Sequence, residues 1–317
     1  MSKVVVGVDG GGTKTHCSVI DYETQTLLGT GISSCSNQNS VGKEKAHQAI
    51  DAAIKSALEN AKVDVSNVVG ICLGISGVDR PDDVNTVKEW VKQIFGESFD
   101  VEKSALVYND GVTAIASGTK GSLEDAMVII SGTGSICIGS KNEKEFVRTG
   151  GWGPKIGDQG NAWSIGNKIL GSVARSVDGV GPFTELADAV KQHLKLKDLT
   201  ELIPYIYASQ EWTRVADLAP LATQLFETDK VAKEIIKSEV QSLRDLACGA
   251  GAKMCWAKDK PFTLVFCGSV LTHKDSVVAE ELTRTLKTCF DNVNIVYPQV
   301  EPSMGAAQLV SNYLKKQ

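Results

Sequence analysis

The sequence predicts an α/β protein made of two copies of one folding module. The first observation is a repeat: residues 4–20, VVVGVDGGGTKTHCSVI, and residues 127–140, MVIISGTGSICIGS, each place glycines and hydroxyl side chains between two apolar, strand-like runs. The second is that helical patterns follow each copy, which favours a duplicated α/β domain. The third is length, because 317 residues suffice for two domains of about 100–200 residues each.

Short apolar runs and amphipathic patterns locate the elements of the first half. Strands are expected at residues 3–9, 16–22, 71–76 and 105–110. A turn-rich stretch follows the second strand, and amphipathic helices are expected over about residues 43–61 and 82–95. The segment DGVTAIASG, residues 110–118, opens a helix or a turn.

The second half begins with the repeated strand–turn–strand at residues 126–140. About residues 164–257 lack strand patterns and are expected to form several helices. Strands are then expected at residues 263–270 and 292–298, and a closing helix at residues 303–316.

No proline- or serine-rich linker marks a domain boundary, so the boundary is placed from the repeat. We expect it near residue 118, which gives a first domain at residues 1–118 and a second at residues 119–302. The closing helix, about residues 303–317, is assigned to the first domain.

The composition argues against several classes of protein. With 42% hydrophobic and 22% charged residues, the chain is close to the globular average, which excludes collagen-like and disordered classes. A formal charge of −5 and a pI near 5.5 argue against a nucleic-acid-binding surface. No apolar run approaches about 18 residues and the chain starts with a strand-like run, so we expect no membrane span and no signal peptide. A cytoplasmic protein without nucleic-acid or membrane partners is expected.

Eight cysteines and four histidines indicate metal or disulfide chemistry only where their spacing fits. No CxxC pair occurs, and several cysteines lie in apolar runs such as ICLGI and LVFCG. A chain of this size builds its core without disulfides. The histidines show no ligand spacing. We therefore expect reduced, mostly buried thiols and no zinc site.

The sharpest local signal is DGGGTKT, residues 9–15. Three glycines after a buried strand allow a tight turn that approaches a ligand closely, and its N–H groups suit a phosphate, with hydroxyls added by Thr13 and Thr15. Asp9 at the strand end can hold Mg²⁺, usually through waters. Because the turn leads into another strand, it is neither a Walker A loop nor a dinucleotide fingerprint. An ordinary glycine hairpin is the alternative.

The second glycine turn, SGTGS at residues 131–135, repeats this pattern, although alone it is equally an ordinary turn. Two such loops in one chain can grip a phosphate chain from both sides. Asp110 ends a strand, at the sheet edge where open α/β folds bind ligands, and is a candidate general base. On spacing alone, a helix N-cap is the favoured role for this aspartate.

Three further segments are candidates for ligand contact. The glycine-rich loop at residues 150–160, around Trp152 and Asp158, suits binding, although Asp158 can equally stabilise the turn. SNQNS, residues 36–40, suits a polyol ligand or is plain turn chemistry. FCGSV, residues 266–270, places a glycine at a strand end, where an adenine or ribose can lie against the backbone.

Taken together and in order, DGGGTKT, SGTGS, CGSV and EPSMGAA resemble the motifs of the sugar kinase–Hsp70–actin superfamily. They match its first phosphate, second phosphate, adenosine and second connecting motifs. SNQNSVG, YNDG and GGWGPKIGDQG make the chain similar to the N-acetylglucosamine kinases of the BadF-type ATPase branch. The resemblance runs over nearly the whole length.

The resemblance implies two ribonuclease H-like (actin-like ATPase) domains with an interdomain cleft. It also implies an ATP- and Mg²⁺-dependent kinase that phosphorylates the primary (6-) hydroxyl of N-acetyl-D-glucosamine or a related amino sugar. Asp110 becomes the catalytic base and Asp9 the metal-linked carboxylate. The implied cofactor contacts are Gly11, Gly12, Thr13, Lys14, Thr133, Gly134, Gly268 and Ser269. The implied sugar contacts are Asn37, Gln38, Asp110, Ser135, Trp152, Gly153 and Asp158.

Two other functions stay open at this point. An activator of the kind that energises iron–sulfur dehydratases needs closely set cysteines, which the sequence lacks. A non-catalytic sugar sensor has no need of Asp9, Asp110 and both glycine loops. The chain also departs from the animal enzymes, which carry a tryptophan where it has Asn39. A homodimer is compatible with the sequence.

Overall fold

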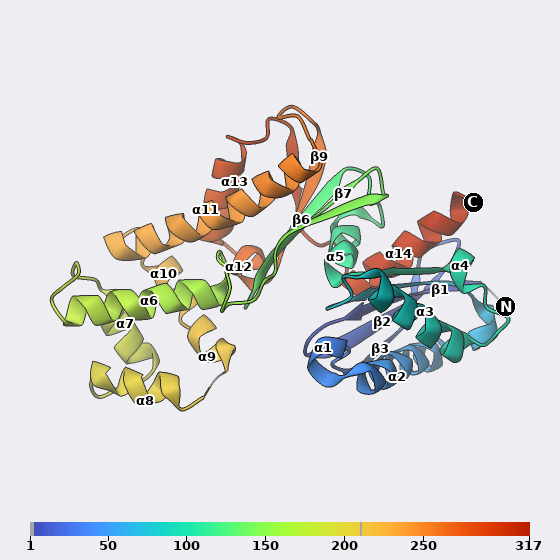
Figure 1. Ribbon diagram of the computed structural model, residues 1–317, viewed down its shortest axis with the longest axis horizontal. Coiled ribbons are helices and arrows are strands. Elements are labelled where there is room, and N and C mark those ends of the chain that lie inside the picture. The colour runs from blue at the N-terminus through green and yellow to red at the C-terminus, as the bar shows by residue number, and fades with distance from the viewer. Residues whose placement is uncertain (1–2, 210) are drawn as a thin grey trace. The chain divides into compact units, whose positions relative to one another are not determined.

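The computed structural model describes residues 3–209 and 211–317 and separates into two compact units (Figure 1). Unit 1 contains the chain as far as Val128, together with Ser140–Glu145 and Val296–Gln317. Unit 2 contains Ile129–Gly139 and Phe146–Ile295. The chain therefore leaves unit 1 later than residue 118, where the sequence analysis placed the boundary.

Unit 1 is built on a five-stranded sheet. Its strands lie in the order β3-β2-β1-β4-β5, with bounds Val4–Gly10 (β1), Lys14–Asp21 (β2), Leu27–Ser34 (β3), Val68–Ile75 (β4) and Ala105–Tyr108 (β5). The pairs β1–β2 and β2–β3 are antiparallel, whereas β1–β4 and β4–β5 are parallel. Since parallel neighbours need a crossover, helices must cover the faces of this sheet.

The helices of unit 1 are α1 (Gln38–Val41), α2 (Lys43–Ala61), α3 (Pro81–Phe95), α4 (Val101–Ser104), α5 (Asp110–Thr119) and α14 (Pro302–Lys315), with a 3₁₀ turn at Val65–Asn67. Alternation along β1 sends Val4, Val6 and Val8 into a core shared with α2 and α3. Gly7 faces the other way, against α14. A Cβ on Gly7 would lie only 2.0 Å from the Ser303 carbonyl oxygen, so this glycine lets the closing helix lie directly on the strand.

Strand β3 lies in the stretch that the sequence analysis described only as turn-rich. Its side chains are mostly exposed or half-buried, so it lacks the apolar run that marks a buried strand. Gly29 and Gly31 show what holds it. A Cβ on either would lie 2.2–2.6 Å from backbone atoms of α2, so the helix packs directly onto the strand. This close approach is a tertiary feature that local patterning does not reveal.

Unit 2 repeats the strand order of unit 1. Its sheet runs β10-β9-β6-β7-β8, with bounds Ala126–Ser131 (β6), Ser135–Lys141 (β7), Glu145–Gly150 (β8), Phe262–Cys267 (β9) and Val293–Val296 (β10). In both sheets the first strand of the unit lies between the second and the fourth. The predicted duplication is thereby confirmed, although β8, like β3, was not expected from the sequence.

Helices make up the remainder of unit 2 (Figure 1). They are α6 (Ala162–Val177), α7 (Leu186–His193), α8 (Leu202–Tyr207), α9 (Trp212–Ala216), α10 (Ala219–Gln224), α11 (Lys230–Lys253), α12 (Ser269–Thr272) and α13 (Val277–Leu286), with a 3₁₀ turn at Leu199–Glu201. The expected helical region at about residues 164–257 is present. Apolar side chains from α6, α7, α10 and α11 are buried among these helices.

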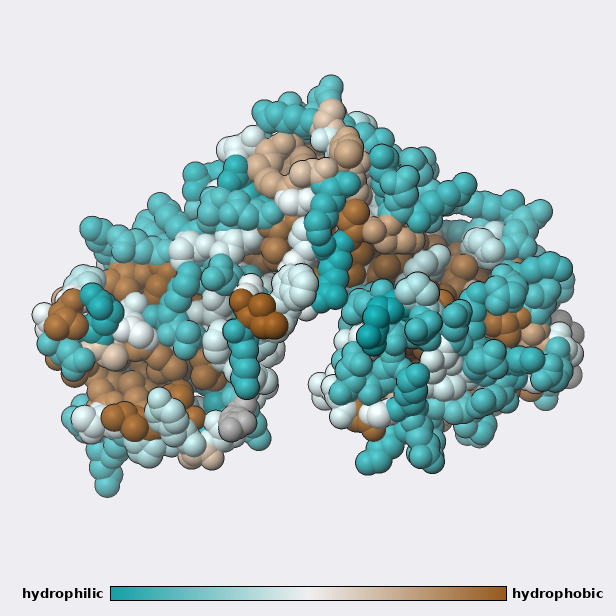
Figure 2. Space-filling model, viewed as in Figure 1, coloured by the Kyte–Doolittle hydropathy of each residue, from teal (hydrophilic) through white to brown (hydrophobic). Residues whose placement is uncertain are grey.

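The visible face of the molecule is largely hydrophilic, with smaller apolar patches (Figure 2). Among the described residues, no helix is both long enough and apolar enough to cross a membrane. All eight cysteines carry free thiols. Cys17, Cys72, Cys137 and Cys267 are buried, and the other four are half-buried or exposed, so burial holds for half of the cysteines where the sequence predicted most.

Candidate active site

The glycine turn of unit 1 connects β1 to β2 at residues 11–13. The Gly11 N–H donates to the Lys14 carbonyl oxygen at 2.9 Å, which closes the turn. A Cβ on Gly12 would meet no atom within 4 Å, and Gly12, Thr13 and Lys14 are exposed. The turn therefore presents open backbone and side-chain donors, as an anion-binding loop requires.

Thr15 does not share this role. The sequence analysis took it as a hydroxyl donor to phosphate, but it is fully buried. Its hydroxyl donates to the Ser34 carbonyl oxygen at 2.7 Å and lies 2.8 Å from Ser36 Oγ. Because β2 side chains alternate, Thr15 points into the protein. It ties the glycine turn to the segment that follows β3.

Carboxylates gather at the end of β1. The pKa of Asp9 is raised to about 7, mainly by burial and then by the neighbouring charges of Asp110 and Glu301. Lys14 opposes this effect. Glu301 was not foreseen, although it lies in the EPSMGAA motif. Its position directly before α14 brings it to this place, because α14 packs on β1 at Gly7.

Asp110 is not the cap of helix α5. The cap is Asn109, whose side-chain oxygen accepts from the Gly111 N–H at 2.9 Å. Asp110 is the first helical residue, and its backbone carbonyl accepts from the Thr113 hydroxyl at 2.8 Å. The expected N-cap role is therefore wrong for Asp110, since the preceding residue fills it. Asn109 also donates to Asp79 Oδ1 at 3.0 Å, and Asp79 was not singled out from the sequence.

The SNQNS segment contains residues with different roles. Asn37 caps α1 through its side-chain oxygen and donates to Ser76 Oγ at 3.2 Å. Asn39 is exposed and lies 3.4 Å from the Gly77 carbonyl oxygen. Gln38 is buried and donates from its amide to Asp83 Oδ1 at 2.8 Å. Of the two predicted sugar contacts, Asn37 is half-buried, and Gln38 holds α1 to α3.

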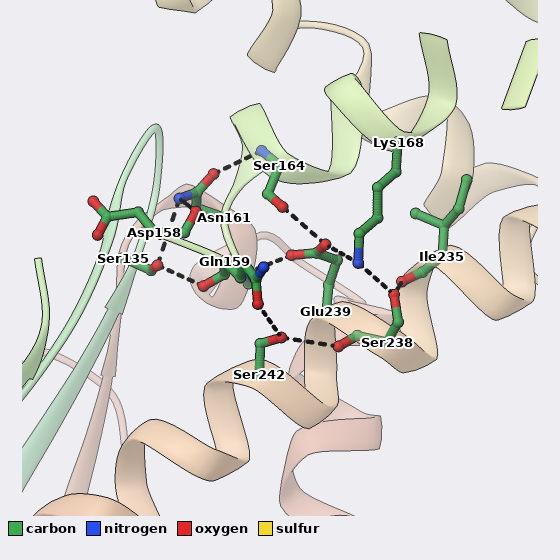
Figure 3. Close-up of polar contacts among 11 residues, drawn as sticks. Ser135, Asp158, Gln159, Asn161, Ser164, Lys168, Ile235, Ser238, Glu239 and Ser242 are labelled. Atoms are coloured by element: carbon green, nitrogen blue, oxygen red, sulfur yellow. Dashed lines mark hydrogen bonds and ion pairs between the residues drawn. The ribbon is translucent and has the colours of Figure 1, made fainter. Parts of the chain in front are cut away.

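Within unit 2, the loop at residues 150–161 packs against the second glycine turn (Figure 3). Ser135 Oγ donates to the Gln159 carbonyl oxygen at 2.6 Å, and the Ala162 N–H donates to the Gly132 carbonyl oxygen at 2.8 Å. Ser135 is buried, so its hydroxyl serves this connection. The glycine turn and the long loop form one local structure.

The same loop carries the other predicted sugar contacts. Asp158 is buried and accepts from the Trp152 N–H at 2.7 Å, while the Trp152 side chain is 68% exposed. The Gly153 carbonyl accepts from three N–H groups, including that of Asp158 at 3.3 Å, and Gly153 has φ +88°. A side chain at this left-handed position would be strained. Asp158 stabilises the turn, and Trp152 presents an exposed indole ring with the Arg148 guanidinium 6.0 Å from its centroid.

A pocket of about 750 Å³ lies entirely within unit 2. Thr133 and Ser269, both predicted cofactor contacts, line it together with side chains from α6, α9, α10 and α13. Gly268 brings these segments together: it has φ +86°, and a Cβ there would lie 2.2 Å from the Ser131 carbonyl oxygen. The end of β9 therefore rests on the backbone of the second glycine turn. The volume and the mixed lining suit a nucleotide.

The carboxylates at the end of β1 suit a Mg²⁺ ion that is bound through bridging waters. Within residues 3–209 and 211–317, no three or more His, Cys, Asp or Glu side chains are grouped to hold a metal directly. Mg²⁺ usually keeps several waters and takes only one or two carboxylates, so Asp9 with its acidic neighbours is a suitable donor set. A cation would also relieve the charge repulsion that raises the pKa of Asp9.

Two repeated sheets of this strand order, each with a glycine turn after its first strand, define an actin-like ATPase fold. The chain belongs to the BadF/BadG/BcrA/BcrD ATPase family, whose model matches residues 6–310.

Similar proteins agree with this class. The chain is 36% identical to the N-acetyl-D-glucosamine kinase of Dictyostelium discoideum, over 99% of this chain and 100% of that protein. It is 30% identical to the N-acetylmuramic acid/N-acetylglucosamine kinase of Clostridium acetobutylicum, over 96% of this chain and 97% of that one. A crystal structure from Chromobacterium violaceum, a candidate N-acetylglucosamine kinase, superposes with a TM-score of 0.68 at 20% identity, covering 98% and 99% of the two chains. The last likeness establishes the fold.

Proposed function

We propose that this protein is an ATP-dependent kinase that phosphorylates the primary (6-) hydroxyl of N-acetyl-D-glucosamine or a closely related amino sugar. Full-length similarity to two amino-sugar kinases supports the substrate class. The observation that carries the mechanism is the position of Asp110. It is the first residue of α5, which Asn109 caps, and its charge acts on Asp9, which directly precedes the first glycine turn.

In this mechanism, Asp110 accepts the proton of the sugar hydroxyl as the hydroxyl oxygen bonds to the γ-phosphorus. The bond from that phosphorus to the β–γ bridging oxygen breaks, and ADP leaves. Such phosphoryl transfer depends mainly on positioning and on charge stabilisation. Exposed N–H groups and Thr13 in the first glycine turn contact phosphate oxygens. In unit 2, Thr133 contacts phosphate, and Ser269 with the surrounding pocket holds the adenosine.

Mg²⁺, which Asp9 would hold through water, supplies positive charge that balances the phosphate oxygens. Trp152 offers its exposed ring to a sugar, and Asn37, whose amide oxygen caps α1 and whose nitrogen donates to Ser76, offers its second N–H to a sugar hydroxyl. Because Gln38 and Ser135 are engaged within the protein, they support these contacts by holding the loops. A cytoplasmic location and a homodimer stay predictions.

The test is ADP release from ATP and Mg²⁺ with a panel of sugars: N-acetylglucosamine, glucosamine, N-acetylmuramic acid and glucose. The expected result is turnover that depends on an N-acetylated amino sugar and yields the 6-phosphate, identified by NMR. ATP hydrolysis that no sugar stimulates would favour an activator ATPase. Tight sugar binding without turnover would favour a sensor, and either result would overturn the proposal.

A further inference from the structure

A carboxylate with no solvent exposure lies at the centre of a polar network in unit 2 (Figure 3). It belongs to Glu239, in the middle of α11. One carboxylate oxygen accepts from the Gly160 N–H, and the other accepts from Ser164 Oγ at 2.8 Å. Glu239 thus joins three segments: α11, the end of the loop at residues 150–161 and the first turn of α6.

Gly160 shows that this contact requires close packing. It has φ +84°, and a Cβ there would lie 2.4 Å from Leu243 Cγ and 3.1 Å from the Glu239 carbonyl oxygen. On its other side, the Gly160 carbonyl accepts from Ser131 Oγ at 2.6 Å. Gly160 therefore lies between α11 and the start of the second glycine turn. Its N–H and its carbonyl are each bound by a different partner.

The rest of the loop is held around this point. Asn161 caps α6 by accepting from the Ser164 N–H at 2.8 Å, and its amide donates to the Asp158 carbonyl oxygen at 2.8 Å. Gln159 accepts from Ser135 Oγ through its carbonyl, and from Ser242 Oγ through its side chain at 3.3 Å. Residues 158–161 are thus fixed on both sides.

The buried charge has one cationic partner in the described part of the chain. Lys168 Nζ lies 2.6 Å from Glu239 Oε1, and the Lys168 side chain reaches in from the surface with 37% of its area exposed. Burying a carboxylate costs several kcal/mol unless a counter-charge and hydrogen bonds offset it. An apolar residue would fill this space at less risk to stability. A carboxylate differs from an apolar residue in having two acceptor oxygens, so it can bind the loop and α6 at the same time.

We propose that Glu239 is the positioning residue of the sugar site: it holds the loop of Trp152, Gly153 and Asp158 against the second glycine turn. This inference rests on the proposed kinase function. Glu239 touches none of the candidate substrate contacts itself and acts through Gly160 and Ser164. Its effect should therefore fall on sugar affinity more than on ATP affinity or on the chemical step.

Glu239→Gln tests this role because the amide keeps the shape but has one acceptor oxygen instead of two. The KM for sugar should rise about 10- to 100-fold, the scale of losing a hydrogen bond to a charged group. The KM for ATP should change less than about threefold. Hydrogen–deuterium exchange of residues 150–161 should be faster in the ligand-free variant. Ser164→Ala, which removes one donor, should shift both readouts in the same direction by less.

Asp229→Asn is the matched control. Asp229 is also a buried carboxylate of α11: it caps the helix at the Ala232 N–H and accepts from Thr184 Oγ1 at 2.9 Å. Its substitution should lower the melting temperature yet leave the sugar KM and the exchange of residues 150–161 unchanged.

A folded Glu239→Gln protein with normal sugar KM and normal exchange would overturn the proposal. So would an equal rise in sugar KM for Asp229→Asn, since the effect would then be general loss of stability. If the wild-type protein phosphorylates no sugar, the proposed function fails. The exchange experiment still decides separately whether Glu239 anchors the loop.

Discussion

The two glycine turns of this protein occupy the same place in two equivalent sheets, yet their surroundings differ. The turn of unit 1 is exposed and lies beside acidic side chains. The buried hydroxyl of Thr15 anchors it by a hydrogen bond to the Ser34 carbonyl oxygen. The turn of unit 2 is equally exposed at Thr133 and Gly134, but the loop at residues 150–161 packs against it, and its Thr133 lines the large pocket. The two units share one strand topology, and the segments packed beside each glycine turn give the two turns different chemistry.

Different contacts hold the two turns in place. In unit 1, the Thr15 hydroxyl bonds to Ser34 and Ser36, and the Ser36 N–H donates to the Gly11 carbonyl oxygen at 3.3 Å. In unit 2, Gly268 lies directly on the Ser131 backbone, Gly160 packs against the Leu243 side chain, and the buried Glu239 carboxylate accepts from the Gly160 N–H. We therefore expect substitutions in unit 1 to change chemistry more readily than fold, and those in unit 2 to do both.

The largest expected effect is at Asp110. Asp110→Asn keeps the shape of the side chain but removes the base, so turnover should fall by roughly 10²–10⁴. The affinities for sugar and ATP should change much less, because binding needs no proton transfer. Steady-state kinetics measure both. Asp100→Asn, which alters an aspartate that does cap a helix, should be almost normal, since asparagine caps equally well. Near-normal turnover in folded Asp110→Asn would exclude the base role.

A glycine in each unit gives the next contrast. Gly268→Ala forces a Cβ against the Ser131 backbone at a left-handed φ, so unit 2 should lose stability and the KM for ATP should rise strongly. Gly12→Ala adds a methyl group to open space, so the melting temperature should hardly change. Its KM for ATP should still rise on the order of tenfold, about 1.4 kcal/mol, if phosphate approaches there. Thermal melts and ATP kinetics separate the two, and equal melting temperatures would contradict the contrast.

Asp9 should make stability depend on pH. Its pKa is raised to about 7, so between about pH 4 and 7 the folded protein keeps a proton that the unfolded chain releases. Stability from this group is therefore lost as the pH rises through that range. Without Mg²⁺, Asp9→Asn should melt a few °C above the wild type at about pH 8 and not at about pH 4. Adding Mg²⁺ should stabilise only the wild type, and a response of both proteins would contradict the metal role.

The smallest effect separates two neighbouring threonines. Thr15→Val removes a buried hydroxyl and leaves its partners unsatisfied, so it should cost about 1–3 kcal/mol of stability with little change in ATP affinity. Thr13→Val alters an exposed side chain, so stability should hold while the KM for ATP rises. Urea unfolding and ATP kinetics test the pair. A reversal of the two results would show that Thr15, as the sequence first suggested, contacts phosphate.

The sequence by itself determined the duplication, the position of both glycine turns and the closing helix. Strand and helix periodicity and glycine runs are local, so they can be read without knowing what packs where. The exposed strand β3 lacked this signal, because the backbone contacts of Gly29 and Gly31 with α2 hold it. The cap of α5 also lacked a local signal, because spacing allows either Asn109 or Asp110 to fill it. The hydrogen bond from the Gly111 N–H to Asn109 Oδ1 shows that Asn109 is the cap.

The tertiary structure alone decided which polar groups face a ligand and which hold the fold. Thr13 and Thr15 are two residues apart and look alike in sequence. Thr13 lies in the turn before β2 and is exposed, whereas Thr15 lies within β2, where Ser34 and Ser36 bind its buried hydroxyl. Glu301 and Glu239 carried no signal, because their partners lie far away in the chain and are brought near only by helix packing. A charge acquires its role from its neighbours within a few ångströms, and folding chooses those neighbours.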